Sequence, residues 1–220
     1  MDCLLYNAFA VKEFLRAAVN SSEISGLFFN PDKKDKSFGG GFTIKGDTAP
    51  NQAGLQLVFG MDDPDLNGSS VISKIKSGKI KALYVVHNDH SEVSQDILDA
   101  LAKVPFLIVE DLWLSPVAKI ADIVLPGAAY FEKTGTFINF QRRLQLLQQA
   151  VNAPEGVKNT WDIVKRLASI QKQNLKWNSY GDVFMQMAKS YPKLEGLTHF
   201  KIGRSGKVLK VAKQTAESSP

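Results

Sequence analysis

Two histidines near the middle of the chain are the first residues whose spacing could hold a metal ion. His87 and His90 flank Asn88 and Asp89 just after a strongly apolar run, and imidazole and carboxylate groups are common metal ligands. A spacing of three residues in a loop is weak evidence, however, and the third histidine, His199, lies far along the chain. We therefore predict that these polar residues cap a following helix and that the chain has no metal site.

A second group of polar residues surrounds two adjacent arginines. Arg142 and Arg143 come shortly after residues 134–139, TGTFIN, and a guanidinium group matches the geometry of a phosphate or carboxylate. This group is therefore the best candidate in the chain for a cluster that binds an anion or a polar ligand. The structural interpretation, with Arg143 in an ion pair with Glu132 or Asp122, is favoured over ligand binding.

The carboxylates and the single cysteine identify no catalytic group. Glu110, Asp111, Asp122 and Glu132 lie near the ends of expected strands, but a catalytic pair needs a mutual geometry that spacing does not supply. Asp122 comes just before an apolar run and is expected to make a local hydrogen bond. Cys3 alone excludes an internal disulfide and a zinc or iron–sulfur site built from thiolates of this chain. We predict no catalytic residue.

The elements that must position these residues are clearest in the middle of the chain. Three apolar runs predict buried strands, at residues 80–86, 106–109 and 123–125. Two helices are expected between them, over residues 92–103 and from Ser115-Pro116 onward. Continuous apolar runs indicate strands buried on both faces, and helical crossovers indicate parallel strands. The sequence therefore predicts an α/β fold, a Rossmann-like parallel sheet with flanking helices, whose carboxyl edge is the expected ligand side.

Further helices are predicted on either side of this region. Amphipathic periodicity indicates helices over residues 4–19, 161–170 and 180–190, and Thr160 is placed to cap the second of them. A short extended pair is expected after Pro126.

The chain is expected to divide into two unequal parts. Residues 31–69 look irregular, with Asp, Lys, Gly and Ser in excess, and they belong to an α/β domain over residues 1–170. Residues 171–220 would form a C-terminal helix, a strand-like piece and a basic tail.

Composition and charge exclude several classes of protein. The 220 residues are 44% apolar and 22% charged, which is typical of a folded globular chain, and the net charge is +5. The lysines are scattered and no stripe of aromatic and basic residues occurs, so nucleic acid is not the expected partner. No apolar run reaches the roughly 18 residues that span a bilayer, and the N-terminus lacks the basic region of a secretory signal. A reducing, cytoplasmic compartment is expected.

Residues 121–139, ADIVLPGAAYFEKTGTFIN, are very similar to a motif of the molybdopterin oxidoreductase superfamily. That motif runs A-D-x-V-L-P, then small residues, then E-x-x-G-T-x-x-N, and it ends in x-E-G-R-x-Q. The flanks agree, with residues 51–54 (NQAG) upstream and residues 154–156 (PEG) and 161–163 (WDI) downstream. The resemblance covers residues 49–170 and implies a domain of the formate dehydrogenase and DMSO reductase type.

Within this superfamily the chain most resembles the large, G-type subunit of the proton-pumping NADH-quinone oxidoreductase. Members of that family carry iron–sulfur clusters in a cysteine-rich N-terminal part, which these residues do not include. The loop that usually reads G-x-N-P is here His87-Asn88-Asp89-His90, and Arg142 replaces the glycine of E-G-R, where added bulk disfavours a backbone contact with a cofactor. The resemblance therefore implies a structural, cofactor-free subunit or fragment of the peripheral arm of respiratory complex I, with no catalytic centre of its own.

That interpretation also implies partners and a location. The partners would be other subunits of NADH-quinone oxidoreductase, which would hold the iron–sulfur clusters. The chain would lie in the cytoplasm, peripheral to the inner membrane through those subunits.

Two alternatives belong to other classes of function. In one, the chain is a fragment of a formate dehydrogenase-like oxidoreductase that binds the nucleotide end of molybdopterin guanine dinucleotide. The resemblance then implies cofactor contacts at Lys133, Thr136, Asn139 and Arg143, in a cleft shared with the loop at residues 87–91. In the other, the chain is an isolated α/β interaction module with a basic tail.

Overall fold

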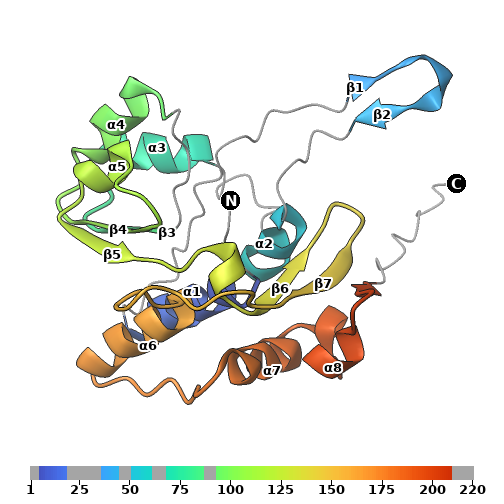
Figure 1. The fold of residues 1–220 in the computed structure, drawn as a ribbon. Helices are drawn as coiled ribbons and strands as arrows, with labels where there is room; N and C mark the ends of the chain where they lie inside the picture. Colours follow the sequence, from blue (N-terminus) through green and yellow to red (C-terminus); the bar gives the residue numbers. More distant parts are fainter. Residues whose placement is uncertain (1–4, 19–35, 45–50, 61–67, 87–92, 210–220) are drawn as a thin grey trace, which may run out of the picture.

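The computed structural model describes residues 5–18, 36–44, 51–60, 68–86 and 93–209 (Figure 1). Most of these residues form two parts that the figure shows one above the other. We call the first the α/β lobe, which comprises residues 68–86 and 93–126. We call the second the helical body, which comprises residues 5–18, 51–60 and 127–209.

The α/β lobe contains one parallel sheet. Its elements in chain order are α3 (Gly68–Lys76), β3 (Leu83–Val86), α4 (Gln95–Leu101), β4 (Leu107–Asp111), α5 (Pro116–Lys119) and β5 (Ile123–Pro126). The strand order is β3-β4-β5 and both pairings are parallel, which confirms the predicted succession of strands and helices. This order follows the chain without reversal, so a parallel sheet is established while the Rossmann-like detail is not confirmed.

The expected burial of the strands on both faces holds only for the central strand. In β4, Leu107 and Val109 are 1% and 0% exposed and pack in one cluster with Val71 of α3. In β5, Ile123 and Val124 are each 41% exposed. A continuous apolar run identifies a strand but does not reveal that the strand lies at the edge of its sheet, where one side has no neighbour.

The helical body surrounds a small antiparallel sheet. Its elements are α1 (Leu5–Ala18), α2 (Gln52–Phe59), η3 (Tyr130–Glu132), β6 (Gly135–Ile138), β7 (Arg143–Leu147), α6 (Thr160–Ile170), α7 (Tyr180–Ser190), η4 (Pro192–Leu194), α8 (His199–Ile202) and β8 (Lys207–Val208). The predicted helices and the extended pair are confirmed, since β6 and β7 form an antiparallel hairpin that β8 extends. None of the described helices is long and apolar enough to cross a membrane.

The prediction that residues 31–69 are irregular is wrong where the structure describes them. This stretch contains the hairpin of β1 (Lys36–Ser37) and β2 (Thr43–Ile44) around η1 (Gly39–Gly41), and also α2. Helix α2 forms because its apolar residues Ala53, Leu55 and Val58 are buried in the core of the body. Gly54 allows close packing, since a Cβ there would lie 2.1 Å from Asn51 Oδ1 and 2.9 Å from Leu5 Cδ1.

Side chains on both sides of residue 170 share one hydrophobic cluster in the body. Phe9 of α1, Val164 of α6 and Phe184 of α7 are each at most 1% exposed within it. Trp177, which precedes α7, is 1% exposed, and its ring centroid lies 6.4 Å from that of Phe9. The domain boundary at residue 170 stays a prediction, and the packing shows that α7 is part of the same core as α1.

Candidate functional site

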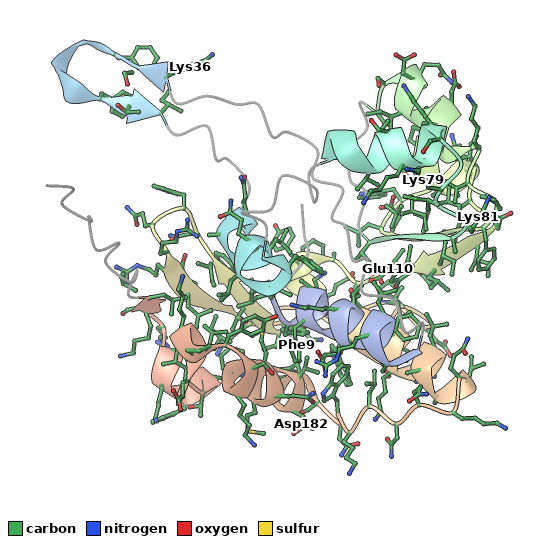
Figure 2. All side chains as sticks on the ribbon, turned by 180° about the vertical axis from the view of Figure 1, so that it is seen from behind. Phe9, Lys36, Lys79, Lys81, Glu110 and Asp182 are labelled. Atoms are coloured by element: carbon green, nitrogen blue, oxygen red, sulfur yellow. The ribbon has the colours of Figure 1, made fainter. Side chains whose placement is uncertain are left out.

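The carboxyl edge of the parallel sheet is organised around Glu110, near the end of β4. Glu110 is fully buried, and its two carboxylate oxygens accept hydrogen bonds from different parts of the molecule. Oε2 accepts from the Tyr84 hydroxyl of β3 at 2.6 Å, and Oε1 accepts from the Thr160 hydroxyl of α6 at 2.6 Å. One side chain therefore ties the sheet of the lobe to the first turn of a helix in the body. Figure 2 shows Glu110 on the side of the lobe that faces the body.

Asp111 shapes the loop that follows β4. Its Oδ1 accepts from the backbone N–H groups of Leu112 at 2.7 Å and Trp113 at 3.4 Å, and its Oδ2 accepts from the Ser115 hydroxyl at 2.8 Å. Ser115 in turn accepts from the Ala118 N–H at 3.1 Å and caps α5, as the sequence predicts. With the backbone held in this way, Trp113 is 72% exposed beside the end of the strand.

The segment after β5 connects the carboxyl edge of the parallel sheet to the helical body through backbone hydrogen bonds. The Gly127 N–H donates to the Asp111 carbonyl at 3.1 Å, and Gly127 pairs with Lys158 in a parallel bridge. The Ala128 N–H donates to the Lys158 carbonyl at 3.2 Å. Lys158, whose side chain is exposed, is thereby placed next to the carboxyl end of β5.

The charged residues of the motif that follows make contacts within the chain. Glu132 Oε2 accepts from the Ala129 N–H at 2.8 Å and closes the η3 turn. Lys133 is 1% exposed, and its Nζ donates to the Ala128 carbonyl at 2.8 Å. Asp122 Oδ2 accepts from the Leu107 N–H at 2.7 Å, so it makes a hydrogen bond, but the partner is 15 residues away at the start of β4 and not local as predicted. Among the described groups, the predicted ion pair of Arg143 with Glu132 or Asp122 is not formed. The guanidinium of Arg143 instead donates to the Ser205 carbonyl.

The four predicted cofactor contacts lie before, within and after β6. Asn139 and Arg143 lie together at the turn of the β6–β7 hairpin, where Asn139 Oδ1 accepts from the Arg143 N–H at 3.0 Å. Arg143 Nη1 donates to the Ser205 carbonyl at 3.0 Å. Lys133 precedes β6 and Thr136 lies within it, and these two residues are 1% and 0% exposed. A cleft lined by all four side chains stays a prediction.

Arg142 occupies the position where the family motif has glycine. Its φ is +60°, in the left-handed region that glycine adopts most easily. Its Nη1 contacts Gln56 Oε1 of α2 at 3.4 Å. A glycine at this position of the motif is therefore explained by the left-handed turn, without any contact to a cofactor.

Two connecting residues have roles that differ from those expected from the sequence. Thr160 is predicted to cap α6, but it is the first residue of the helix and its hydroxyl binds Glu110. Asn51, part of the NQAG segment, is 1% exposed and its Oδ1 accepts from the Ile138 N–H at 2.8 Å. These partners are 50 and 87 residues apart, so no local pattern could reveal them.

The predicted metal-binding alternative falls outside the described part of the chain. His87 and His90 lie in the undescribed stretch 87–92, as does the start predicted for the following helix, which begins at Gln95 after Ser94. Among the residues that the structure does describe, no group of three His, Cys, Asp or Glu side chains could hold a metal ion.

Comparison with known proteins now assigns the family. The model of the family "Molybdopterin oxidoreductase" matches residues 13–170. This is more than half of the chain, and the chain belongs to that family.

Individual relatives define the resemblance more closely. The alpha subunit of F420-dependent formate dehydrogenase 1 from Methanococcus maripaludis is 36% identical over 150 residues, which cover 66% of this chain and 22% of that protein. The G 2 subunit of NADH-quinone oxidoreductase from Rhizobium meliloti is 29% identical over 147 residues, covering 66% of this chain and 17% of that protein. Acetylene hydratase from Pelobacter acetylenicus matches in structure with a TM-score of 0.49 and 16% identity, over 65% of this chain and 21% of that chain. The chain thus spans about a fifth of the length of the curated relatives it matches.

Proposed function

We propose that this chain is part of a formate dehydrogenase-like oxidoreductase that depends on molybdopterin guanine dinucleotide, and that it contacts the nucleotide end of the cofactor. The sequence comparison supports this alternative over the structural subunit of complex I, because the formate dehydrogenase relative is 36% identical and the NADH-quinone oxidoreductase relative is 29% identical. Because the chain spans only about a fifth of these relatives, it would supply one part of the cofactor site.

The observation that carries the proposal is the carboxyl edge of the parallel sheet, the side on which α/β sheets bind ligands. Two side chains at this edge suit the two chemical parts of a nucleotide. Lys158 is exposed beside Gly127 and offers a cation for a phosphate. Trp113 is 72% exposed and offers a flat apolar ring on which a purine base can stack. The residues present therefore fit the nucleotide end of the cofactor.

The four contacts implied by the resemblance enter the proposal in different ways. Arginine has five N–H donors, so Arg143, which gives one to Ser205, retains the means to bind a phosphate. Asn139 would hold the turn that carries Arg143, because its Oδ1 accepts two backbone N–H groups. Lys133 and Thr136 are buried, so in this proposal they would support the site from the protein interior. The Thr136 hydroxyl is buried without a partner among the described residues, as expected of a group that a ligand or another segment completes.

The positions of these residues indicate which roles belong to the cofactor and which to this chain. When bound, the molybdenum end of the cofactor supplies the oxidation–reduction chemistry. Residues of this chain would bind the phosphates and the base, and the hydrogen bonds of Asp111 would keep the loop carrying Trp113 in place.

Calorimetric titration of the chain with guanosine diphosphate tests the proposal. We expect saturable binding that adenosine diphosphate does not reproduce. Lys158→Ala should weaken binding about tenfold if the phosphates lie at the sheet edge, and Arg143→Ala should do so if they lie at the hairpin turn. Circular dichroism checks that both variants stay folded. Absence of saturable binding to the unaltered chain would overturn the proposal.

One observation favours the structural role as a second candidate. Glu110, Asp111, Glu132 and Lys133 all bond to groups of the same chain, as a purely structural element requires. Under this candidate the partners would be other subunits of an NADH-quinone oxidoreductase, at the periphery of a membrane. It requires that guanosine diphosphate does not bind and that the purified chain carries neither molybdenum nor iron by elemental analysis.

A further inference from the structure

The amino edge of the parallel sheet gathers lysines from α3, from α5 and from the loops that follow α3 and α4. In a parallel sheet with helical crossovers, the helices end and the strands begin at the same edge. Six lysines occupy such positions, namely Lys74, Lys76, Lys79, Lys81, Lys103 and Lys119. All except Lys74 have exposed side chains. We call this surface, with the apolar residues described below, the basic tip.

Backbone hydrogen bonds show that these segments are adjacent. The Leu83 N–H at the start of β3 donates to the Phe106 carbonyl before β4 at 2.9 Å. The Asp122 N–H before β5 donates to the Leu107 carbonyl at 2.9 Å. Figure 2 shows Lys81 near the rim of the lobe, and Glu110 on the side that faces the body. The lysines therefore share one surface at the far end of the lobe from the candidate site.

The six lysines have no ion pair in the described part of the chain. Two exposed carboxylates lie near them. Asp122 Oδ2 accepts from the Leu107 N–H, and Asp99, four residues before Lys103, accepts from Gln95 Nε2. Lys74, Lys76 and Lys119 lie in the last turns of helices, where a cation interacts favourably with the helix dipole. That explanation does not extend to Lys79 and Lys81, which lie beyond α3.

Large apolar side chains lie at the amino edge and on the strand β5 that begins there. Phe106, Ile120, Ile123 and Val124 are 41%, 38%, 41% and 41% exposed. Phe106 follows Lys103 by three residues, and Ile120 follows Lys119 directly, whereas Ile123 and Val124 are the first two residues of β5. Partly exposed apolar groups next to charged ones are typical of a protein–protein interface.

We propose that the basic tip is a docking surface for an acidic protein surface that also presents apolar or aromatic side chains. A bilayer fits less well, because membrane association of this kind uses a helix whose apolar side chains project into the lipid, and the apolar groups here are more than half buried. Nucleic acid fits less well, because the six cations include no arginine and, of the four apolar side chains described here, Phe106 alone has a ring on which a base could stack.

The test uses a labelled random copolymer of glutamate and tyrosine, with polyglutamate for comparison, and measures binding to the full chain by fluorescence anisotropy. We expect the copolymer to bind more tightly than polyglutamate. Lys79→Glu/Lys81→Glu should weaken copolymer binding about tenfold at an ionic strength of about 0.15 M. The matched control is Lys189→Glu/Lys193→Glu, which makes the same change of net charge on exposed lysines of the body and should alter binding less than about twofold.

The remaining outcomes overturn the proposal. Equal weakening by both double variants would show that net charge alone drives binding. Tighter binding to phosphatidylserine vesicles or to duplex DNA than to the copolymer would assign the surface to a lipid or nucleic-acid partner. Circular dichroism establishes that the variants are folded, and Lys79→Gln/Lys81→Gln repeats the test without introducing acidic groups.

Discussion

Two groups of charged side chains at opposite edges of one parallel sheet are placed in opposite ways, since the carboxylates at one edge are buried and the lysines at the other are exposed. At the carboxyl edge, Glu110 and Asp111 are 0% and 4% exposed, and hydroxyl or N–H groups of the chain bind their oxygens. At the amino edge, Lys79 and Lys81 are exposed and have no ion pair among the described residues. A buried charge must be bonded inside the protein, whereas an exposed charge is stabilised by water. The buried carboxylates of the first edge therefore contribute to holding the molecule together, whereas the exposed lysines of the second edge stay available to a partner.

The largest expected effect comes from removing the buried carboxylate. Glu110→Ala should lower the free energy of unfolding by about 3 kcal/mol, because the Tyr84 and Thr160 hydroxyls both lose their acceptor. Urea denaturation followed by circular dichroism measures the change. Glu110→Gln, which keeps an acceptor oxygen of similar shape, should lose clearly less. Equal stability of the alanine variant and the unaltered chain would contradict the role of Glu110 as a tie between lobe and body.

A smaller effect is expected for the carboxylate at the opposite edge. Asp122 is exposed and makes one hydrogen bond to the Leu107 N–H, so Asp122→Ala should lower the free energy of unfolding by about 1 kcal/mol. The same urea experiment compares it with Glu110→Ala. A larger loss for Asp122→Ala than for Glu110→Ala would reverse the proposed ranking of the two edges.

His199 is an intermediate case between the two edges, because its ring is partly buried and one ring nitrogen has no hydrogen-bond partner among the described residues. Its Nε2 is buried without a partner among the described residues, and its ring lies 4.7 Å from that of Phe184 and 5.3 Å from that of Tyr180. Burial lowers the pKa of His199 below its ordinary value of 6.5, because the charged imidazolium is disfavoured there. The unfolded chain then binds the proton more readily. The contribution of His199 to stability is thus complete above pH 6.5 and is lost as the pH falls through the lowered pKa.

The measurement for His199 is the free energy of unfolding between about pH 7.5 and pH 5, with His199→Phe as the comparison. The phenyl ring keeps the stacking and cannot be protonated. As the pH falls, we expect the free energy of unfolding of the unaltered chain to decrease relative to that of His199→Phe. Titratable groups that both chains share affect both values equally and do not contribute to this difference. Parallel pH profiles would show that His199 is not disfavoured as a cation in the folded state.

The smallest effect on stability is expected at the basic tip. Lys79→Glu/Lys81→Glu should leave the midpoint of urea unfolding unchanged within error, because both side chains are hydrated and unpaired in the described structure. The same variant is expected to weaken binding of the acidic copolymer. A large loss of stability would mean that these lysines have structural partners, and the contrast between the two edges would then fail.

The local elements of this protein and its family could be predicted from neighbouring residues alone. The apolar runs of β3, β4 and β5 and the helix start at Ser115-Pro116 are recognisable because strands and helix starts depend on residues close in sequence. The motif at residues 121–139 likewise points to the molybdopterin oxidoreductase family, to which the match over residues 13–170 assigns the chain. The more specific expectation of a complex I subunit depends on a few departures from the motif, and one of these, Arg142, occupies a left-handed turn.

The pairing of polar groups, by contrast, depends on how distant segments pack. Thr160 binds Glu110 across 50 residues of sequence and Asn51 binds Ile138 across 87, and in each case the partner is chosen by how the helical body is packed. The same packing buries Lys133 and places Asn139 and Arg143 at the other end of β6. Hydrogen bonds act over about 3 Å in space, so residues distant in sequence become partners only after the chain has folded.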